Sequence, residues 1–86
     1  MAYIISERSF EKSLTDADLE DMMARTAPCL EDYGARWIRS YLSNTRQRMI
    51  CAFEAPDAES VRTALRVSGM AFERVWQGDE LGPERD

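Results

Sequence analysis

Two strand-like stretches decide the fold of this chain: Trp37-Ile38-Arg39-Ser40-Tyr41-Leu42 and Arg48-Met49-Ile50-Cys51-Ala52-Phe53-Glu54. Successive side chains of a strand point to opposite faces of the sheet, so Ile38 and Leu42 share one face while Trp37 and Tyr41 share the other. A small antiparallel sheet normally leaves one face in water and then alternates apolar with polar residues. Here both faces are apolar, and we expect both to be covered.

A long helix is predicted between the first strand and these two. It begins at Thr15, whose hydroxyl can cap the helix together with Asp18, and it ends at Gly34. Pro28 lies inside it and removes a backbone hydrogen bond. We therefore expect a kink at this point, or a restart of the helix at Thr26 or Ala27.

The remaining elements complete a known order. A second helix is predicted to begin after Asp57 and to end near Ser68, and the outer strands are predicted over residues 3–10 and 72–77. The order is then β-α-β-β-α-β. Two right-handed β-α-β units place both helices on one face of a four-stranded antiparallel sheet, which is the ferredoxin-like arrangement of the α+β class. We expect one domain over residues 1–77 and an acidic, flexible tail over residues 78–86.

The sheet face without helices is predicted to carry aromatic, aliphatic and charged side chains. The helix-covered face is expected to carry Ile38, Ser40, Leu42, Met49, Cys51 and Phe53. The open face then carries Trp37, Arg39, Tyr41, Arg48, Ile50, Ala52 and Glu54, with Tyr3, Ile5 and Glu7 beside them. Such a surface drives association in water, so we expect a homodimer formed through it. A one-residue slip of the hairpin register would exchange the faces of residues 48–54.

The composition limits the classes of function. A net charge of −5 over 86 residues argues against nucleic-acid binding, which requires a basic surface. One local cluster, made of Arg36, Arg39, Arg46 and Arg48, is either a solvated hairpin tip or an anion-binding patch. Histidine is absent, which removes the commonest metal ligand and the commonest general base.

Neither a signal peptide nor a membrane span is expected, so the chain is predicted to be cytoplasmic and to have no membrane partner. Cys29 and Cys51 have neither a CxxC nor a metal-knuckle spacing. We expect both cysteines to be reduced, with a disulfide as the less favoured alternative.

Several short motifs carry a resemblance: Trp37-Ile38-Arg39-Ser40-Tyr41, Cys51-Ala52-Phe53-Glu54-Ala55-Pro56-Asp57, Val61-Arg62, the opening residues 6–10 and the closing residues 69–75. They resemble a small bacterial family of unknown function with a ferredoxin-like fold, some members of which are regarded as nickel-binding proteins. The resemblance extends to about Gln77. It implies a dimer of ferredoxin-like subunits, in agreement with the strand pattern.

The resemblance also implies nickel binding, but two residues depart from the family. Its members usually carry His at the positions of Arg39 and Ala64. A guanidinium does not ligate a divalent cation and repels it. We therefore expect a polar or anionic ligand in place of a metal, and no cofactor is predicted.

The favoured hypothesis is a dimeric binding protein that holds a small polar or anionic ligand in a pocket on the open face. Arg39, Tyr41, Glu7, Trp37 and Glu54 would line that pocket, and Arg39 could bind a carboxylate or phosphate bidentately. The plainer alternative is a structural ion pair of Arg39 with Glu7 or Glu54, which an interface would require.

Two other classes stay open. A cofactor-independent monooxygenase or isomerase, as found among dimeric ferredoxin-like proteins, would use Glu54 or Glu7 beside Arg39; this rests on fold analogy, and we assign no catalytic residue. An interaction module would use the acidic tail or the open sheet edges to bind another protein.

Overall fold

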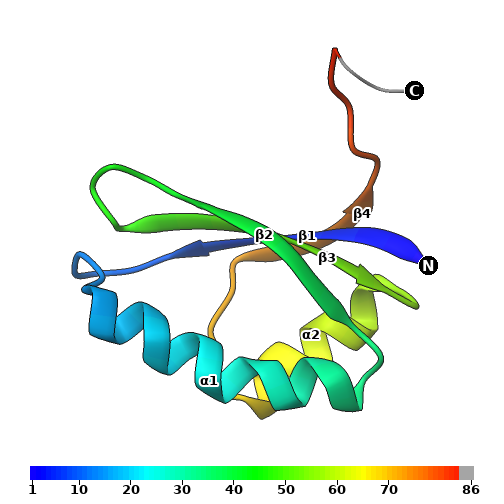
Figure 1. The fold of residues 1–86 in the computed structure, drawn as a ribbon, viewed down its shortest axis with the longest axis horizontal. Helices are drawn as coiled ribbons and strands as arrows, with labels where there is room; N and C mark the ends of the chain where they lie inside the picture. Colours follow the sequence, from blue (N-terminus) through cyan, green and yellow to red (C-terminus); the bar gives the residue numbers. More distant parts are fainter. Residues whose placement is uncertain (84–86) are drawn as a thin grey trace.

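The computed structural model describes residues 1–83 and has the predicted order of elements. Its strands and helices are β1 (Ala2–Ser9), α1 (Asp16–Asp32), β2 (Arg36–Leu42), β3 (Arg48–Ala55), α2 (Ala58–Val67) and β4 (Arg74–Gly78). Both helices lie below the sheet in Figure 1. Neither described helix has the length and apolar composition needed to cross a lipid bilayer.

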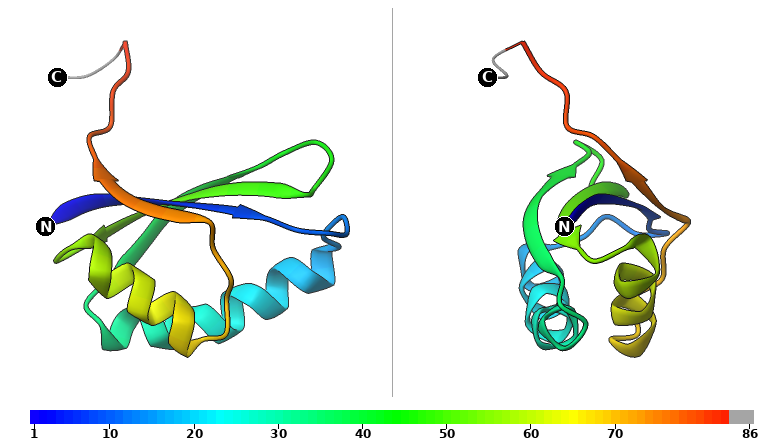
Figure 2. Two further views of the ribbon diagram at one scale, coloured as in Figure 1. Left: turned by 180° about the vertical axis from the view of Figure 1, so that it is seen from behind. Right: turned by 90° about the vertical axis from the view of Figure 1, so that its right-hand side faces the viewer.

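The sheet is antiparallel, with the strands in the order β2-β3-β1-β4. Both helices cover one face, and no helix or strand of residues 1–83 lies on the opposite face (Figure 2). The prediction of a ferredoxin-like α+β fold is confirmed. After β4, the chain turns away from the helices toward the open side of the sheet (Figures 1 and 2).

Helix α1 begins where the sequence predicts. The Thr15 hydroxyl accepts a hydrogen bond from the Asp18 amide at 3.1 Å, and the Asp18 carboxylate accepts one from the Thr15 amide at 2.9 Å. The helix runs without interruption past Pro28, so the predicted restart at Thr26 or Ala27 is wrong. Gly34 follows the helix with a φ of +70°, a conformation that favours glycine.

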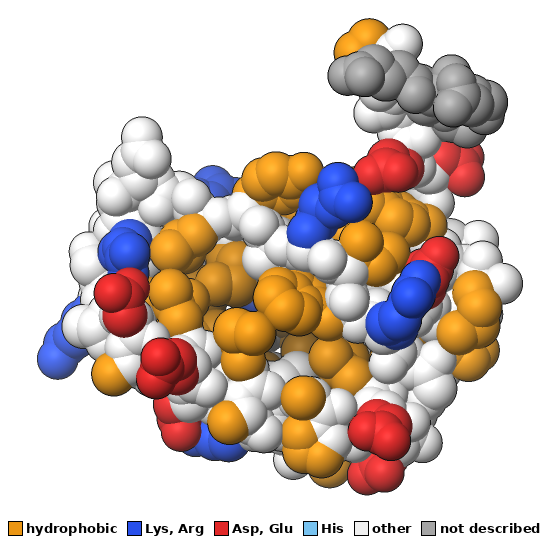
Figure 3. All heavy atoms as spheres, in the orientation of Figure 1, with side chains coloured by type: hydrophobic (Ala, Val, Ile, Leu, Met, Phe, Trp, Pro, Cys, Tyr) orange, Lys and Arg blue, Asp and Glu red, His pale blue; other side chains and the backbone are white. Residues whose placement is uncertain are grey.

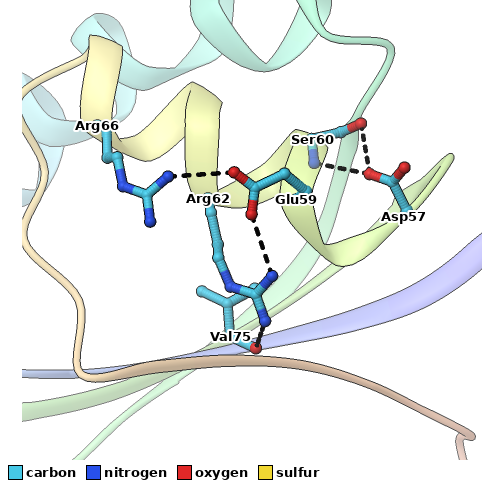
Figure 4. Close-up of polar contacts among 6 residues, drawn as sticks. All are labelled: Asp57, Glu59, Ser60, Arg62, Arg66 and Val75. Carbon is cyan, nitrogen blue, oxygen red and sulfur yellow. Dashed lines mark hydrogen bonds and ion pairs between the residues drawn. The ribbon is translucent and has the colours of Figure 1, made fainter.

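Helix α2 is fixed at its start and along its length (Figure 4). The Asp57 carboxylate accepts a hydrogen bond from the Ser60 amide at 2.7 Å, which caps the helix. Arg62 donates to the Val75 carbonyl of β4 at 2.7 Å and forms an ion pair with Glu59 at 3.2 Å. Figure 4 shows Arg62 reaching from the helix to the strand, which ties α2 to β4.

The core lies between the helices and the sheet. Its buried members on the sheet include Ile4, Met49, Cys51, Phe53 and Val75, which all belong to the helix-covered face. The predicted assignment of β3 to its two faces is therefore confirmed, and the alternative hairpin register is wrong. Both cysteines are free thiols, as expected.

The last strand is shorter than predicted. Phe72 precedes β4, which begins at Arg74, and the Phe72 side chain packs half-buried against the core. Arg66 of α2 lies over the Phe72 ring, with 5.6 Å between its guanidinium carbon and the ring centroid. The predicted tail covers residues 78–86; residues 79–83 belong to no helix or strand, and residues 84–86 lie outside the described residues.

Candidate functional site

An irregularity in β2 determines where its aromatic residue lies. Trp37 pairs with Phe53 and Arg39 pairs with Ala52, so Ile38 is one extra residue in β2. A β-bulge of this kind shifts the alternation of side chains by one position. Trp37 therefore shares the helix-covered face with Phe53, and the prediction that it lies on the open face beside Arg39 is wrong.

The bulge creates a chain of hydrogen bonds on the helix-covered face, which is exposed at Trp37 and buried at Cys51. The Trp37 indole N–H donates to the Ser40 hydroxyl oxygen at 2.8 Å, and the Ser40 hydroxyl donates to the Cys51 sulfur at 2.8 Å. Burial raises the pKa of the Cys51 thiol, and the hydrogen bond from Ser40, the nearby Ser6 hydroxyl and the charge of Arg8 oppose this only in part. Cys51 is thus held as a neutral thiol at neutral pH, which makes it a poor nucleophile.

A pocket of about 280 Å³ lies between α1 and the strands β1, β2 and β3. Its lining is mostly apolar: Leu19, Met22, Met23, Ala27, Leu30, Trp37, Leu42, Met49, Cys51, Phe53 and Leu65, with Ser6, Arg8, Thr26 and Ser40 as the polar members. Figure 3 shows hydrophobic side chains gathered between the helix layer and the sheet, where the surface is hollowed. The pocket exists because α1 packs loosely: of its 17 residues only Leu30 is buried.

Two polar residues of β1 lie on this covered face. The Ser6 hydroxyl is fully buried and makes no hydrogen bond of ordinary geometry within residues 1–83, although it lies close enough to the Cys51 sulfur to lower the pKa of that thiol. Arg8 is 8 % exposed; it donates to the Ala71 carbonyl at 2.7 Å and to the Met70 sulfur at 3.5 Å, and its guanidinium lies over the Phe10 ring. Burial lowers the pKa of Arg8 below its ordinary value. Within residues 1–83, Arg8 forms no ion pair with an acidic side chain.

The open face gathers a second polar group around Arg39. Its guanidinium lies 3.7 Å from the carboxylate of Glu80, which follows β4 in the chain. A hydrogen bond with Tyr41 raises the pKa of Arg39, and the charge of Glu80 adds to the effect. The pKa of Tyr3 is raised by burial and by the same carboxylate. The structure thus brings together Arg39, Tyr41, Tyr3 and Glu80. Arg39 and Tyr41 were predicted as site residues, Tyr3 was predicted only to share their face, and Glu80 was not predicted.

The two predicted acidic residues lie on the open face but have other partners within the subunit. Glu7 accepts a hydrogen bond from the Trp76 indole N–H at 2.8 Å. Glu54 forms an ion pair with Arg36, which is directly opposite it on β2. Neither carboxylate pairs with Arg39 in the subunit, so the base and electrophile that the enzyme hypothesis requires are not brought together there.

The donor atoms do not suit a metal. Among the residues that the structure describes, no three His, Cys, Asp or Glu side chains gather closely enough to hold a metal ion. The sequence has no histidine at all. At the centre of the open-face group lies the Arg39 guanidinium, whose positive charge excludes a cation and attracts an anion.

Sequence reasoning missed the pocket under α1 and its two polar residues. One signal was present: in β1, Ser6 and Arg8 alternate with residues of the open face and fall on the same side as Ile4. A hydroxyl and a guanidinium at positions that a helix covers are unusual, because buried polar groups need partners. Their presence indicates a polar feature beneath the helices.

The chain is similar to a known protein family and to a solved structure. Residues 3–77 match the family described as nickel responsive protein SCO4226-like. The crystal structure of SCO4226 from Streptomyces coelicolor A3(2) superposes with a TM-score of 0.84 at 14 % sequence identity, covering 94 % of this chain and all of that one. No curated protein sequence matches the chain. Because the family match spans most of the described domain, this chain belongs to the SCO4226-like family of nickel-responsive proteins.

Proposed function

We propose that this chain is a cytoplasmic, homodimeric binding protein that holds a small anionic ligand at Arg39 and Tyr41 on the open face of the sheet. One observation carries the anion site: Arg39, next to the Tyr3 and Tyr41 side chains, already faces a carboxylate, that of Glu80. The Glu80 carboxylate, 3.7 Å from the Arg39 guanidinium, occupies the position that the anionic group of a ligand would take.

The residues of this chain do not favour binding of the nickel that the family description names. The sequence lacks histidine, and Arg39 brings a positive charge to the open face. Divalent nickel prefers imidazole nitrogen among protein ligands. The donor set therefore favours an anion over a metal.

The dimer is supported by the apolar side chains that the open face presents to water. Tyr41 is 65 % exposed, and Ile50 and Trp76 are each 44 % exposed. Tyr41 and Ile50 are paired neighbours on β2 and β3, and Trp76 lies on β4, on the other side of β1 and opposite Ile5. A second copy of the same face would remove this surface from water. Free cysteines accord with a reducing compartment.

Titration calorimetry with malonate, a small dianion without an apolar body, tests the anion site. We expect binding to wild type, at least about tenfold weaker binding to Arg39→Gln, and tighter binding to Glu80→Gln, since the internal competitor is removed. Arg66→Gln is the matched control, because Arg66 forms its ion pair with Glu59 on α2. Equal malonate affinity of wild type and Arg39→Gln would contradict the proposal.

Analytical ultracentrifugation at micromolar concentration tests the dimer. Ile50→Asp places a charge in the centre of the open face and is expected to give monomers of about 10 kDa. The control is Val67→Asp, since Val67 is 61 % exposed but lies on α2, away from the open face. A wild-type chain that sediments only as a monomer would exclude the dimer without bearing on the malonate result.

A further inference from the structure

We propose that the pocket between α1 and the sheet is a second binding site, which takes a small amphiphile with an apolar body and a carboxylate head. This site lies on the helix-covered face, so it is separate from the anion site around Arg39. The pocket lining, the buried hydroxyl of Ser6 and the guanidinium of Arg8 identify the chemical class of its ligand.

The apolar body follows from the size and lining of the pocket. Its volume of about 280 Å³ is large for a domain of 86 residues. An apolar cavity of about 150 Å³ stays dry and binds benzene, so this pocket has room for a ligand nearly twice as large. The apolar lining is favourably covered by an apolar group that removes it from water. A medium-chain aliphatic or an aromatic body would cover it.

The head group follows from the polar members of the lining. In the described part of the chain, the buried Ser6 hydroxyl has only the weakly interacting Cys51 sulfur near it and makes no hydrogen bond of ordinary geometry, and Arg8 carries a positive charge without an acidic partner. Both lie on β1, two residues apart on the same face. A buried guanidinium is stabilised by an anion that accepts its hydrogen bonds, and a carboxylate can accept from a hydroxyl as well. A neutral alcohol would satisfy Ser6 but leave the charge of Arg8 uncompensated.

The ligand can enter from the side of α1. Ala27 and Met23 line the pocket and are exposed, so the pocket reaches the surface between the helix and the sheet. The same helix carries Ala24, which is exposed but does not line the pocket.

Thermal unfolding with octanoate and with octanol tests the proposal, because the two probes share an apolar chain and differ in their heads. We expect saturating octanoate to raise the melting temperature of wild type by at least about 3 °C, and octanol to bind at least about tenfold more weakly. Ala27→Phe fills the pocket and should abolish the octanoate shift, whereas Ala24→Phe should retain it. In NMR spectra, octanoate should shift the amide resonances of Ser6, Thr26 and Ser40.

The polar head is tested by Ser6→Ala and Arg8→Met. Both should weaken octanoate binding, and Arg8→Met should also remove the preference over octanol. If Arg8→Met does not fold, Ser6→Ala and the pair at Ala24 and Ala27 still decide the question. The proposal is overturned if octanoate produces no shift, if octanoate and octanol bind equally to wild type, or if Ala27→Phe binds octanoate as Ala24→Phe does. None of these outcomes depends on malonate binding at Arg39.

Discussion

The indole N–H of Trp37 donates a 2.8 Å hydrogen bond to the hydroxyl of Ser40, three residues further along β2. In a regular strand, residues separated by three positions point to opposite faces of the sheet. The contact is possible because Ile38 is an extra residue in β2, so Trp37 and Ser40 point to the same face of the sheet. This bulge assigns the indole to the helix-covered pocket and leaves Arg39 and Tyr41 on the open face.

Removing the middle member of this hydrogen-bond chain should change the reactivity of Cys51. Ser40→Ala is expected to lower the free energy of unfolding by about 1 kcal/mol. It should also raise the pKa of Cys51 further, since the bond from Ser40 favours the thiolate. Alkylation of Cys51 by iodoacetamide at pH 8–9, measured in a Cys29→Ser background, should become slower.

Ser68→Ala is the matched control for this measurement. Its hydroxyl donates to the Leu65 carbonyl at 3.0 Å in α2, far in sequence from Cys51. The control should leave the alkylation rate unchanged. Faster alkylation in Ser40→Ala than in the control would mean that the hydrogen bond does not act on the thiol.

Ser6→Ala should stabilise the unliganded protein. The hydroxyl is buried and makes no hydrogen bond of ordinary geometry in the described residues, so its removal relieves a desolvation cost of about 1–3 kcal/mol, part of which reappears as lost packing. We expect the free energy of unfolding in urea to rise by about 1 kcal/mol. A loss of stability would show that the hydroxyl has a partner in solution.

The cap of α2 should contribute to the pH dependence of stability. Hydrogen bonds from Ser60 lower the pKa of Asp57 below its unfolded value of about 3.9. A carboxyl with a lowered folded pKa contributes stability that is complete above the unfolded pKa and is lost as the pH falls through the folded pKa. We therefore expect wild type to lose stability below about pH 4.

Asp57→Asn removes the negative charge but keeps a side chain that can cap the helix, because Asn is also a good N-cap residue. At pH 7 its melting temperature should stay close to that of wild type. Between about pH 4 and pH 2 it should lose less stability than wild type, as measured by thermal unfolding at several pH values. If both proteins lose stability equally as the pH falls, Asp57 does not contribute to the pH dependence of stability.

Gly34→Ala should destabilise the protein by about 1–2 kcal/mol. The φ of +70° is unfavourable for any residue with a Cβ, although the nearest side chain, that of Pro56, is at an ordinary contact distance of 3.6 Å. Strain in the backbone, and not a clash, is the expected cause. Urea unfolding of this variant beside Gly82→Ala, whose Cβ would meet open space, measures the difference.

The sequence by itself determined the order of the elements, the caps at Thr15 and Asp57, and the face assignment of β1 and β3. These features depend on local rules: a side-chain oxygen near a helix start, and a period of two in a strand. It also placed Arg39 and Tyr41 together on the open face. The continuous helix through Pro28 shows the limit of such rules, because the hydrogen bonds of the other turns outweigh the one that Pro28 removes.

Only the tertiary structure decided the position of Trp37 and the existence of the pocket. A bulge depends on how β2 pairs with β3, and an extra residue such as Ile38 has no sequence signal of its own. The pocket depends on how closely α1 approaches the sheet, which is a sum of many contacts between residues far apart in the chain. The approach of Glu80 to Arg39 likewise required the path of the chain after β4, which strand periodicity does not specify.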